Sequence, residues 1–178
     1  MAMSEPGGAR RWAVTATLLA GLAAATVGAQ APATTPAAAA LKPGTASGTL
    51  TVGTTTVNLT HAYVAGPTSD LYVVELTDRP IPEEALAAEL RRGGGQGFLR
   101  SGKAQGLLFY LSDKGFVVTV IPFAGDVRGD RMLGSLDAFD PFTIAAGQAT
   151  GAGAISAEKT NQGWSFKGRF AAAVRPVK

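Results

Sequence analysis

Apolar and polar residues alternate along much of the chain after residue 48, which is the pattern of half-buried β-strands. The clearest run is 164–174, where large apolar residues occupy every second position and Lys167 and Arg169 fall between them. One face of this strand should therefore lie in the core while the other faces water. Because each aromatic ring buries roughly 150–250 Å², Trp164, Phe166 and Phe170 should anchor that core.

Further segments rich in Val, Thr and aromatic residues also predict strands, and they are 49–52, 55–64, 71–77, 107–111, 116–123 and 142–156. The first two, separated by Gly53, should form a hairpin. The segment 71–77 is apolar on both faces and should lie centrally in the sheet. Asp113 and Gly115 provide the turn chemistry for a second hairpin, and Pro122 should end its second strand or place that strand at an edge.

One short helix is expected at about 82–92, between the strands. Pro82 and the acidic residues after it suit the first turn of a helix, and Gly93 suits its end. Leu86 and Leu90 form a narrow apolar stripe that should cover an open end or an edge of the sheet. The chain is therefore predicted to be mainly β, a single antiparallel β-sandwich or open β-barrel of about seven strands with one inserted helix.

The first residues have a different pattern, that of a secretory signal peptide. The basic pair Arg10-Arg11 precedes an uncharged, mostly apolar run from residue 12 to residue 29, which ends in the small residues Val27-Gly28-Ala29. Cleavage near Ala29 would send the mature chain to the periplasm or outside the cell. General secretion is favoured over the twin-arginine route because the rest of that motif is absent around the Arg pair. A retained anchor is disfavoured because Ala, Gly and Thr dilute the run, so no membrane span is expected in the mature chain.

Composition divides the remainder into a spacer and a domain. Residues 30–47 are rich in Ala, Pro and Thr, carry no charge before Lys42, and are expected to form a flexible linker. Residues 48–178, about 130 residues, have the length of a single β domain with a real core. The chain has no Cys, so neither a disulfide nor a lipid attached to a cysteine is possible.

The charge balance points to no particular partner. Removal of residues 1–29 lowers the basic count from 16 to 14 and the acidic count from 13 to 12, which leaves a net charge of +2. Such a small excess, with no basic stripe, does not indicate a nucleic-acid partner.

Two neighbouring segments carry a resemblance. The strand Gly-Thr-Leu-Thr-Val that begins at Gly48 leads to Asn-Leu-Thr-His-Ala-Tyr at 58–63, and Val-Val-Glu-Leu-Thr-Asp-Arg-Pro-Ile-Pro follows at 73–82. Over residues 48–82 the chain resembles small uncharacterised exported bacterial proteins that share this order of motifs. The resemblance implies export and a β domain. It implies no activity and no functional residue.

His61, the only histidine, is the first candidate for acid–base chemistry or ligand binding. By strand alternation it should share a largely apolar face with Val57, Leu59 and Tyr63, which favours a structural, partly buried histidine. Together with Tyr63 and Tyr72 it forms the candidate ligand-binding set. No catalytic residue, metal ligand or cofactor is predicted. A hydrolase would need a carboxylate beside His61, and Asp70 and Asp78 are the candidates.

Other short motifs have ordinary explanations. The Gly-rich segment 93–97 lacks the Gly-Lys-Ser/Thr ending of a phosphate loop, and Arg128-Gly129-Asp130 is short enough to arise by chance. The aspartates at 126, 130, 137 and 140 do not have the spacing of a calcium loop. The sequence thus predicts an exported, non-catalytic β domain that binds a small ligand or an envelope or protein partner. The alternative is a periplasmic hydrolase that uses His61 with a nearby carboxylate.

Overall fold

A computed structural model describes residues 40–90, 97–129, 132–160 and 163–177 of the chain. The strands are β1 (Thr45–Val52), β2 (Thr55–Thr68), β3 (Leu71–Thr77), β4 (Gly106–Ser112), β5 (Phe116–Ala124), β6 (Val127–Arg128), β7 (Met132–Asp137), β8 (Phe139–Ala145), β9 (Gln148–Ile155) and β10 (Trp164–Arg175). The helices are α1 (Glu83–Leu90), α2 (Gly97–Arg100) and α3 (Ala157–Thr160). The predicted signal peptide, residues 30–39 of the predicted linker, and residues 91–96 lie outside these ranges.

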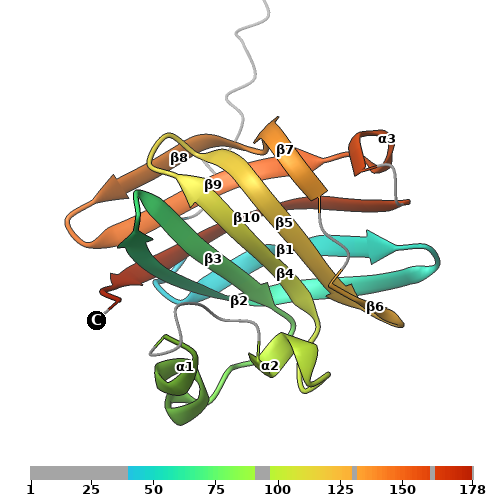
Figure 1. The fold of residues 1–178 in the computed structure, drawn as a ribbon, viewed down its shortest axis with the longest axis horizontal. Helices are drawn as coiled ribbons and strands as arrows, with labels where there is room; N and C mark the ends of the chain where they lie inside the picture. Colours follow the sequence, from blue (N-terminus) through green and yellow to red (C-terminus); the bar gives the residue numbers. More distant parts are fainter. Residues whose placement is uncertain (1–39, 91–96, 130–131, 161–162, 178) are drawn as a thin grey trace, which may run out of the picture. The chain divides into compact units, whose positions relative to one another are not determined.

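The described strands form one continuous sheet in the order β6-β5-β4-β3-β2-β1-β10-β9-β8, with β7 also paired to β5 (Figure 1). Neighbours are antiparallel, except that the end of β10 pairs in parallel with β2, Val174 opposite Val64. The sheet curls into a half-barrel. The prediction of a mainly β, open-barrel fold is confirmed, with ten strands in the described residues where about seven were expected.

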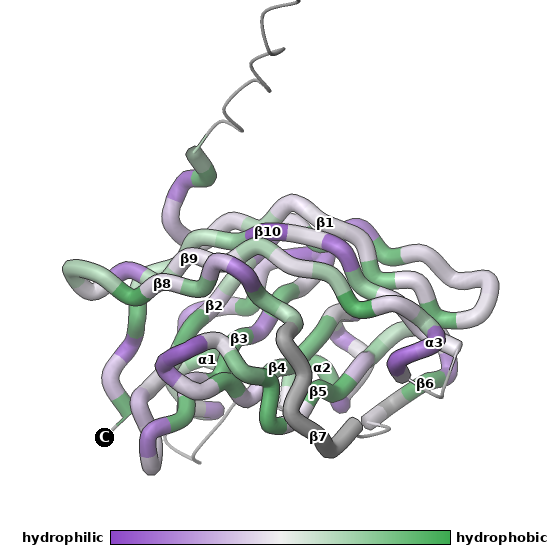
Figure 2. The backbone as a smooth tube through the Cα atoms, turned by 90° about the horizontal axis from the view of Figure 1, so that it is seen from above, coloured by the Kyte–Doolittle hydropathy of each residue, from purple (hydrophilic) through white to green (hydrophobic). Residues whose placement is uncertain are grey.

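The main core lies on one face of this sheet, called the inner face below. Buried phenylalanine rings meet there, with ring centres 4.9 Å apart for Phe109 and Phe139 and 5.4 Å apart for Phe139 and Phe170. Phe109 belongs to β4 and Phe139 to β8, which are far apart in the strand order. Their contact therefore requires the sheet to curl around a shared core. Figure 2 shows β1 and β10 along one side of this sheet and β4 and β5 along the other.

The opposite, outer face is covered in part by two helices. Leu99 of α2 is fully buried in a second apolar cluster with outer-face residues of β3, β4 and β5, including Val73, Leu108 and Ile121. Leu86 of α1 is also buried, and it lies against outer-face residues of β2 and β3. The predicted helix exists at 83–90. It covers a face of the sheet, whereas the sequence predicted that it would cover an end or an edge. None of the helices in the described residues is long and apolar enough to cross a membrane.

Two sequence boundaries need correction. Strand β1 begins at Thr45, so the last residues assigned to the linker 30–47 belong to the sheet. The segment 142–156, predicted as a single strand, lies within the β8–β9 hairpin. Its turn is formed by Ala146 and Gly147, both with positive φ of 49° and 74°. Ala-Gly is not one of the usual Asn-Gly or Asp-Gly turn pairs, which is why the pattern concealed the turn.

Candidate functional site

The structure separates the three residues predicted to bind a ligand. Tyr63 pairs with Glu75, and His61 pairs with Thr77, along the outer face of β2 and β3. Tyr72 lies on the inner face, where its ring is 6.5 Å from that of Phe142. The structure therefore does not bring His61, Tyr63 and Tyr72 around one space.

A register shift in β2 explains why the expected face of His61 was wrong. Leu59 and Ala62 both point into the main core, although strict alternation would place them on opposite faces. The β1–β2 pairing shifts register at this point, between the pairs Gly48–Leu59 and Thr45–His61. Beyond the shift, His61 and Tyr63 therefore lie on the outer face, while Val57 and Leu59 stay on the inner one.

The hydrogen bonds of His61 involve its neighbour rather than an acid. The Thr60 hydroxyl donates to the backbone oxygen of Asp78 at 3.0 Å and lies 2.8 Å from Nδ1 of His61. A hydroxyl has one proton to donate, so when both contacts form, Nδ1–H of His61 is the donor to Thr60.

The carboxylates proposed for the hydrolase alternative have other roles. Asp78 accepts a hydrogen bond from the backbone N–H of Gln105 at 2.9 Å and pairs with Arg79 at 3.1 Å. Asp70 lies in the tight turn after β2, with a positive φ of 67°. Within the described residues, no hydrogen bond or ion pair joins His61 to a carboxylate. The hydrolase alternative stays a prediction from the sequence, because the described residues do not show the pair of His61 and a carboxylate that it needs.

An open groove lies on the outer face of the sheet, across β1, β10 and β9. Its volume is about 590 Å³, which is within the range of small-molecule sites. The residues that line it are Ser47, Thr49, Asp140, Ala152, Gly153, Ala154, Lys167, Gly168 and Arg169. We call this set the outer groove.

Strand register places both cations of the outer groove on its central strand, β10. Lys167 has Thr49 and Ala154 as its cross-strand neighbours. Two positions further on, Arg169 lies between Ser47 and Ala152 in the same way. Residues two apart on a strand project to the same face about 7 Å apart. The two cations thus stand over a floor of small side chains, and the small size of those neighbours keeps the groove open.

Between these two rows, three glycines pair across the same strands. Gly168 of β10 lies opposite Gly48 of β1 and Gly153 of β9. A Cβ at Gly153 would lie 1.6 Å from the oxygen of Ala138, and one at Gly48 would lie 2.6 Å from the oxygen of Lys167. Only glycine allows such close backbone contact, so this row is needed for the strand packing that forms the floor of the groove.

The electrostatics of the outer groove favour an anion. Within the described residues, neither Lys167 nor Arg169 forms an ion pair. Asp140 is exposed and is the one carboxylate in the lining. The net formal charge of the lining is therefore positive.

A different set of polar groups lies under α1. Tyr63, Glu75, Leu86 and Arg175 line a small cavity of about 10 Å³, which is room for roughly one water molecule. The Tyr63 hydroxyl accepts a hydrogen bond from the backbone N–H of Ile81 at 2.8 Å. Burial raises the pKa of the Tyr63 phenol above its usual value of 10.0.

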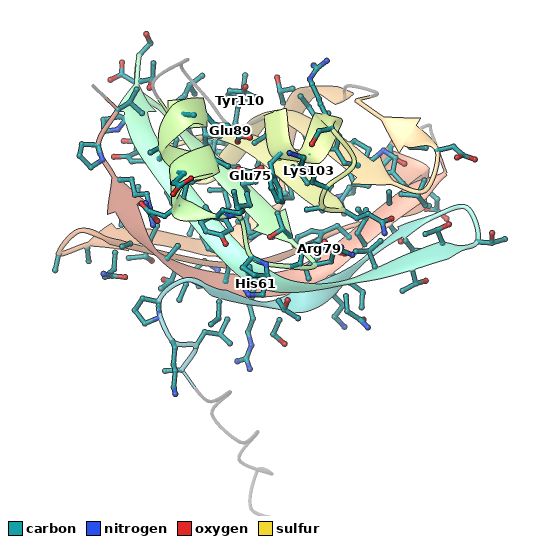
Figure 3. All side chains as sticks on the ribbon, turned by 90° about the horizontal axis from the view of Figure 1, so that it is seen from below. His61, Glu75, Arg79, Glu89, Lys103 and Tyr110 are labelled. Atoms are coloured by element: carbon teal, nitrogen blue, oxygen red, sulfur yellow. The ribbon has the colours of Figure 1, made fainter. Side chains whose placement is uncertain are left out.

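Two carboxyl groups are buried in this region, and one of them, that of Glu75, lines the cavity (Figure 3). Glu75 of β3 is 2% exposed and Glu89 of α1 is 6% exposed. Burial, and then the nearby charge of Glu89, raise the pKa of the Glu75 carboxyl well above its usual value of 4.5. Oε1 of Glu89 accepts a hydrogen bond from the backbone N–H of Phe98, at the start of α2. Glu89 thus connects the two helices that cover the sheet.

The sequence reasoning missed both of these sites. Glu75 did carry a signal, because it is the single acid in the apolar run Leu-Tyr-Val-Val-Glu-Leu-Thr of a strand predicted to be central. Glu89 carried none, since its burial depends on how α2 packs. Lys167 and Arg169 were correctly expected to face away from the core, but their small neighbours on β1 and β9 depend on strand order.

In the described part of the chain, no group of three or more His, Asp or Glu residues is close enough to hold a metal ion. Asp130 of the Arg-Gly-Asp tripeptide lies outside the described residues, as does most of the Gly-rich segment 93–97. Gly97 itself begins α2.

Comparison with known proteins assigns no function to these residues. No protein-family model matches the chain, and neither a curated protein nor a solved structure matches it. The function must therefore be argued from the residues themselves.

Proposed function

We propose that this chain is an exported, non-catalytic binding domain, and that the outer groove takes a small anionic ligand with an apolar body. The observation that carries the proposal is the pair Lys167 and Arg169, which stand without ion-pair partners among the described residues over a floor of small side chains. Export rests on the signal-peptide pattern of residues 1–29.

The chemistry of the lining suggests the ligand class. Lys167 and Arg169 can donate charge-assisted hydrogen bonds to a carboxylate, sulfonate or phosphate group. The methyl groups of Ala152 and Ala154 offer apolar contact beside them. Small-molecule sites usually combine such an apolar floor with a few polar groups that fix orientation. Asp140 adds negative charge at one part of the lining, which disfavours ligands with anionic groups at both ends.

The inner face is a poorer candidate for a ligand. Its space is filled by the protein's own side chains, since Phe109, Phe166 and Phe170 are each 2% exposed or less. A ligand there would have to displace well-packed aromatic rings, each of which contributes several kcal/mol, about 3–5, to stability. The outer groove needs no such displacement.

The test is a calorimetric titration of the full chain with octanoate, and with octan-1-ol as a neutral ligand of the same length. Octanoate is expected to bind more tightly, and its affinity should weaken as salt is added. Removing a charge-assisted hydrogen bond costs about 1.5–3 kcal/mol, so Lys167→Ala and Arg169→Ala should each weaken octanoate binding by at least about tenfold.

Lys103→Ala is the matched control, because Lys103 is an exposed cation that does not line the groove. Its affinity for octanoate should equal that of the unmodified chain. Equal binding of octanoate and octan-1-ol, or equal losses from all three substitutions, would contradict a specific anion site.

A further inference from the structure

The outer groove holds one acid and two cations that do not neutralise one another. Asp140 lines the same groove as Lys167 and Arg169. Among the described residues, none of the three forms an ion pair or a side-chain hydrogen bond. Opposite charges that face one groove but stay apart can each bind the complementary charge of a ligand.

A bulge in β8 places Asp140 in the groove. Phe139 and Phe142 both pack in the main core, although they are three positions apart. Phe139 pairs with Gly153 and Phe142 with Gly151, so two residues of β8 lie opposite one residue of β9. This extra residue lets both phenylalanines point inward while Asp140, between them, lines the outer face.

Strand register aligns the acid with one of the cations. Arg169 of β10 pairs with Ala152 of β9, and the bulge places Asp140 on the other side of Ala152. Figure 1 shows β9 between β8 and β10. Because neighbouring strands lie about 4.8 Å apart, the backbones of Asp140 and Arg169 are separated by about 10 Å. The methyl group of Ala152 lies between them, so no bulky side chain of β9 divides the two charges in this row.

We propose that Asp140 is an ammonium subsite of the outer groove, and that the ligand is a zwitterion of the ω-amino acid class. Its carboxylate binds Lys167 and Arg169, its chain crosses the methyl group of Ala152, and its ammonium group binds Asp140. This proposal rests on ligand binding in the outer groove, and it narrows the ligand class by giving the far end of the apolar body a positive charge.

The spacing of the groove selects among zwitterions. An α-amino acid carries both charges on one carbon, so it cannot reach Asp140 and the cations of β10 together. An extended ω-amino acid with the chain length of octanoate separates its charges by a distance similar to two strand spacings. A dianion of that length would place its second carboxylate against Asp140 and be repelled.

The test is a calorimetric titration of the full chain and of Asp140→Asn with three ligands of one chain length, which are ω-aminooctanoate, octanoate and octanedioate. At about 0.15 M salt, exposed charges more than about 8 Å apart are largely screened, so Asp140 acts mainly on the ligand end next to it. An exposed ion pair changes an affinity by up to about fivefold. Asp140→Asn should therefore weaken ω-aminooctanoate binding by about two- to fivefold, strengthen octanedioate binding by a similar factor, and leave octanoate binding nearly unchanged.

Asp126→Asn is the matched control, because it removes the same charge from an exposed aspartate that does not line the groove. It should leave the affinities for all three ligands as they are in the unmodified chain. Octanoate binding by Asp140→Asn shows in addition that the groove of this variant is intact.

The outcomes separate this proposal from the proposed function. Equal effects of Asp140→Asn on the three ligands would overturn the ammonium subsite, and so would tighter binding of ω-aminooctanoate, since Asp140 would then merely offset the cations. If octanoate binding still depends on Lys167 and Arg169 in either case, the proposed function stands and the zwitterion alone is excluded. If none of the three ligands binds, both proposals are overturned. Binding of ω-aminooctanoate without binding of octanoate, weakened by Asp140→Asn, would support the subsite and overturn the broader ligand class.

Discussion

Phe170 provides a direct test of how the main core of the half-barrel is packed. Its side chain is 2% exposed, and its ring centre lies 5.4 Å from that of Phe139 and 6.4 Å from that of Phe142. These contacts link β10 to β8, the strand at one edge of the sheet. Truncating a buried phenylalanine to alanine costs about 3–5 kcal/mol, so Phe170→Ala should lower the free energy of unfolding by that amount.

Urea unfolding followed by the fluorescence of buried Trp164 is a suitable assay, and Phe116→Ala is the matched control. Phe116 is 42% exposed, so its truncation should cost about 0.5 kcal/mol or less. A cost of Phe170→Ala no greater than that of Phe116→Ala would contradict the position of the Phe170 ring in the core.

Gly151 allows a stricter test of the same contact. A Cβ at Gly151 would lie 2.7 Å from Cε1 of the Phe170 ring. Overpacking of this kind costs about 1–3 kcal/mol, so Gly151→Ala should destabilise the chain on its own. In the Phe170→Ala background the methyl group would enter the space left by the ring, and the cost should largely disappear. Additive costs, within about 0.5 kcal/mol, would show that the ring does not lie over Gly151.

Other contacts give further predictions. Tyr63→Phe leaves the backbone N–H of buried Ile81 without its acceptor, which should cost about 1–3 kcal/mol in urea unfolding. The hydrogen bond from Arg175 lowers the pKa of Glu83 below 4.5, so the Arg175→Ala variant should show a higher Glu83 pKa by NMR titration. In the unmodified chain the Glu83–Arg175 pair stabilises the fold above about pH 4.5, and this contribution is lost as the pH falls through the lowered pKa of Glu83. An unchanged Glu83 titration in the Arg175→Ala variant would contradict the pairing. Gly153→Ala would bring a Cβ to 1.6 Å from a backbone oxygen, so thermal unfolding should show a marked loss of stability, whereas an unchanged melting temperature would exclude the close strand contact.

The sequence predicted two of the strands closely, for different reasons. The segment 164–174 became β10 with its aromatic residues in the core, because regular alternation with one buried face specifies the register of a strand. The segment 71–77 became β3 with the predicted bounds, because a short apolar run is typical of a strand buried on both faces. The β8–β9 turn was missed because Ala146 adopts positive φ without the usual Asn or Gly at that position.

The candidate sites were less predictable, because each depends on elements that are distant in sequence. The outer groove requires β1 and β9 to flank β10. Thr49 of β1 and Ala154 of β9 are more than a hundred residues apart in the sequence. The face assigned to His61 was wrong because a register shift reverses the positions that directly follow it in β2. Glu75 was visible as a lone acid in an apolar strand, but its neighbour Glu89 was not.

The central claim is that the outer groove binds an anionic ligand through Lys167 and Arg169 with an apolar floor beside them. Its most direct test is an NMR experiment on the full chain with octanoate, in which nuclear Overhauser effects between the octanoate methylene protons and protein methyl groups are recorded. The account predicts such contacts with the methyl groups of Ala152 and Ala154, and their loss in the Lys167→Ala, Arg169→Ala double variant. Contacts with Leu86 or Val73 under the helices, or none with either alanine, would contradict it.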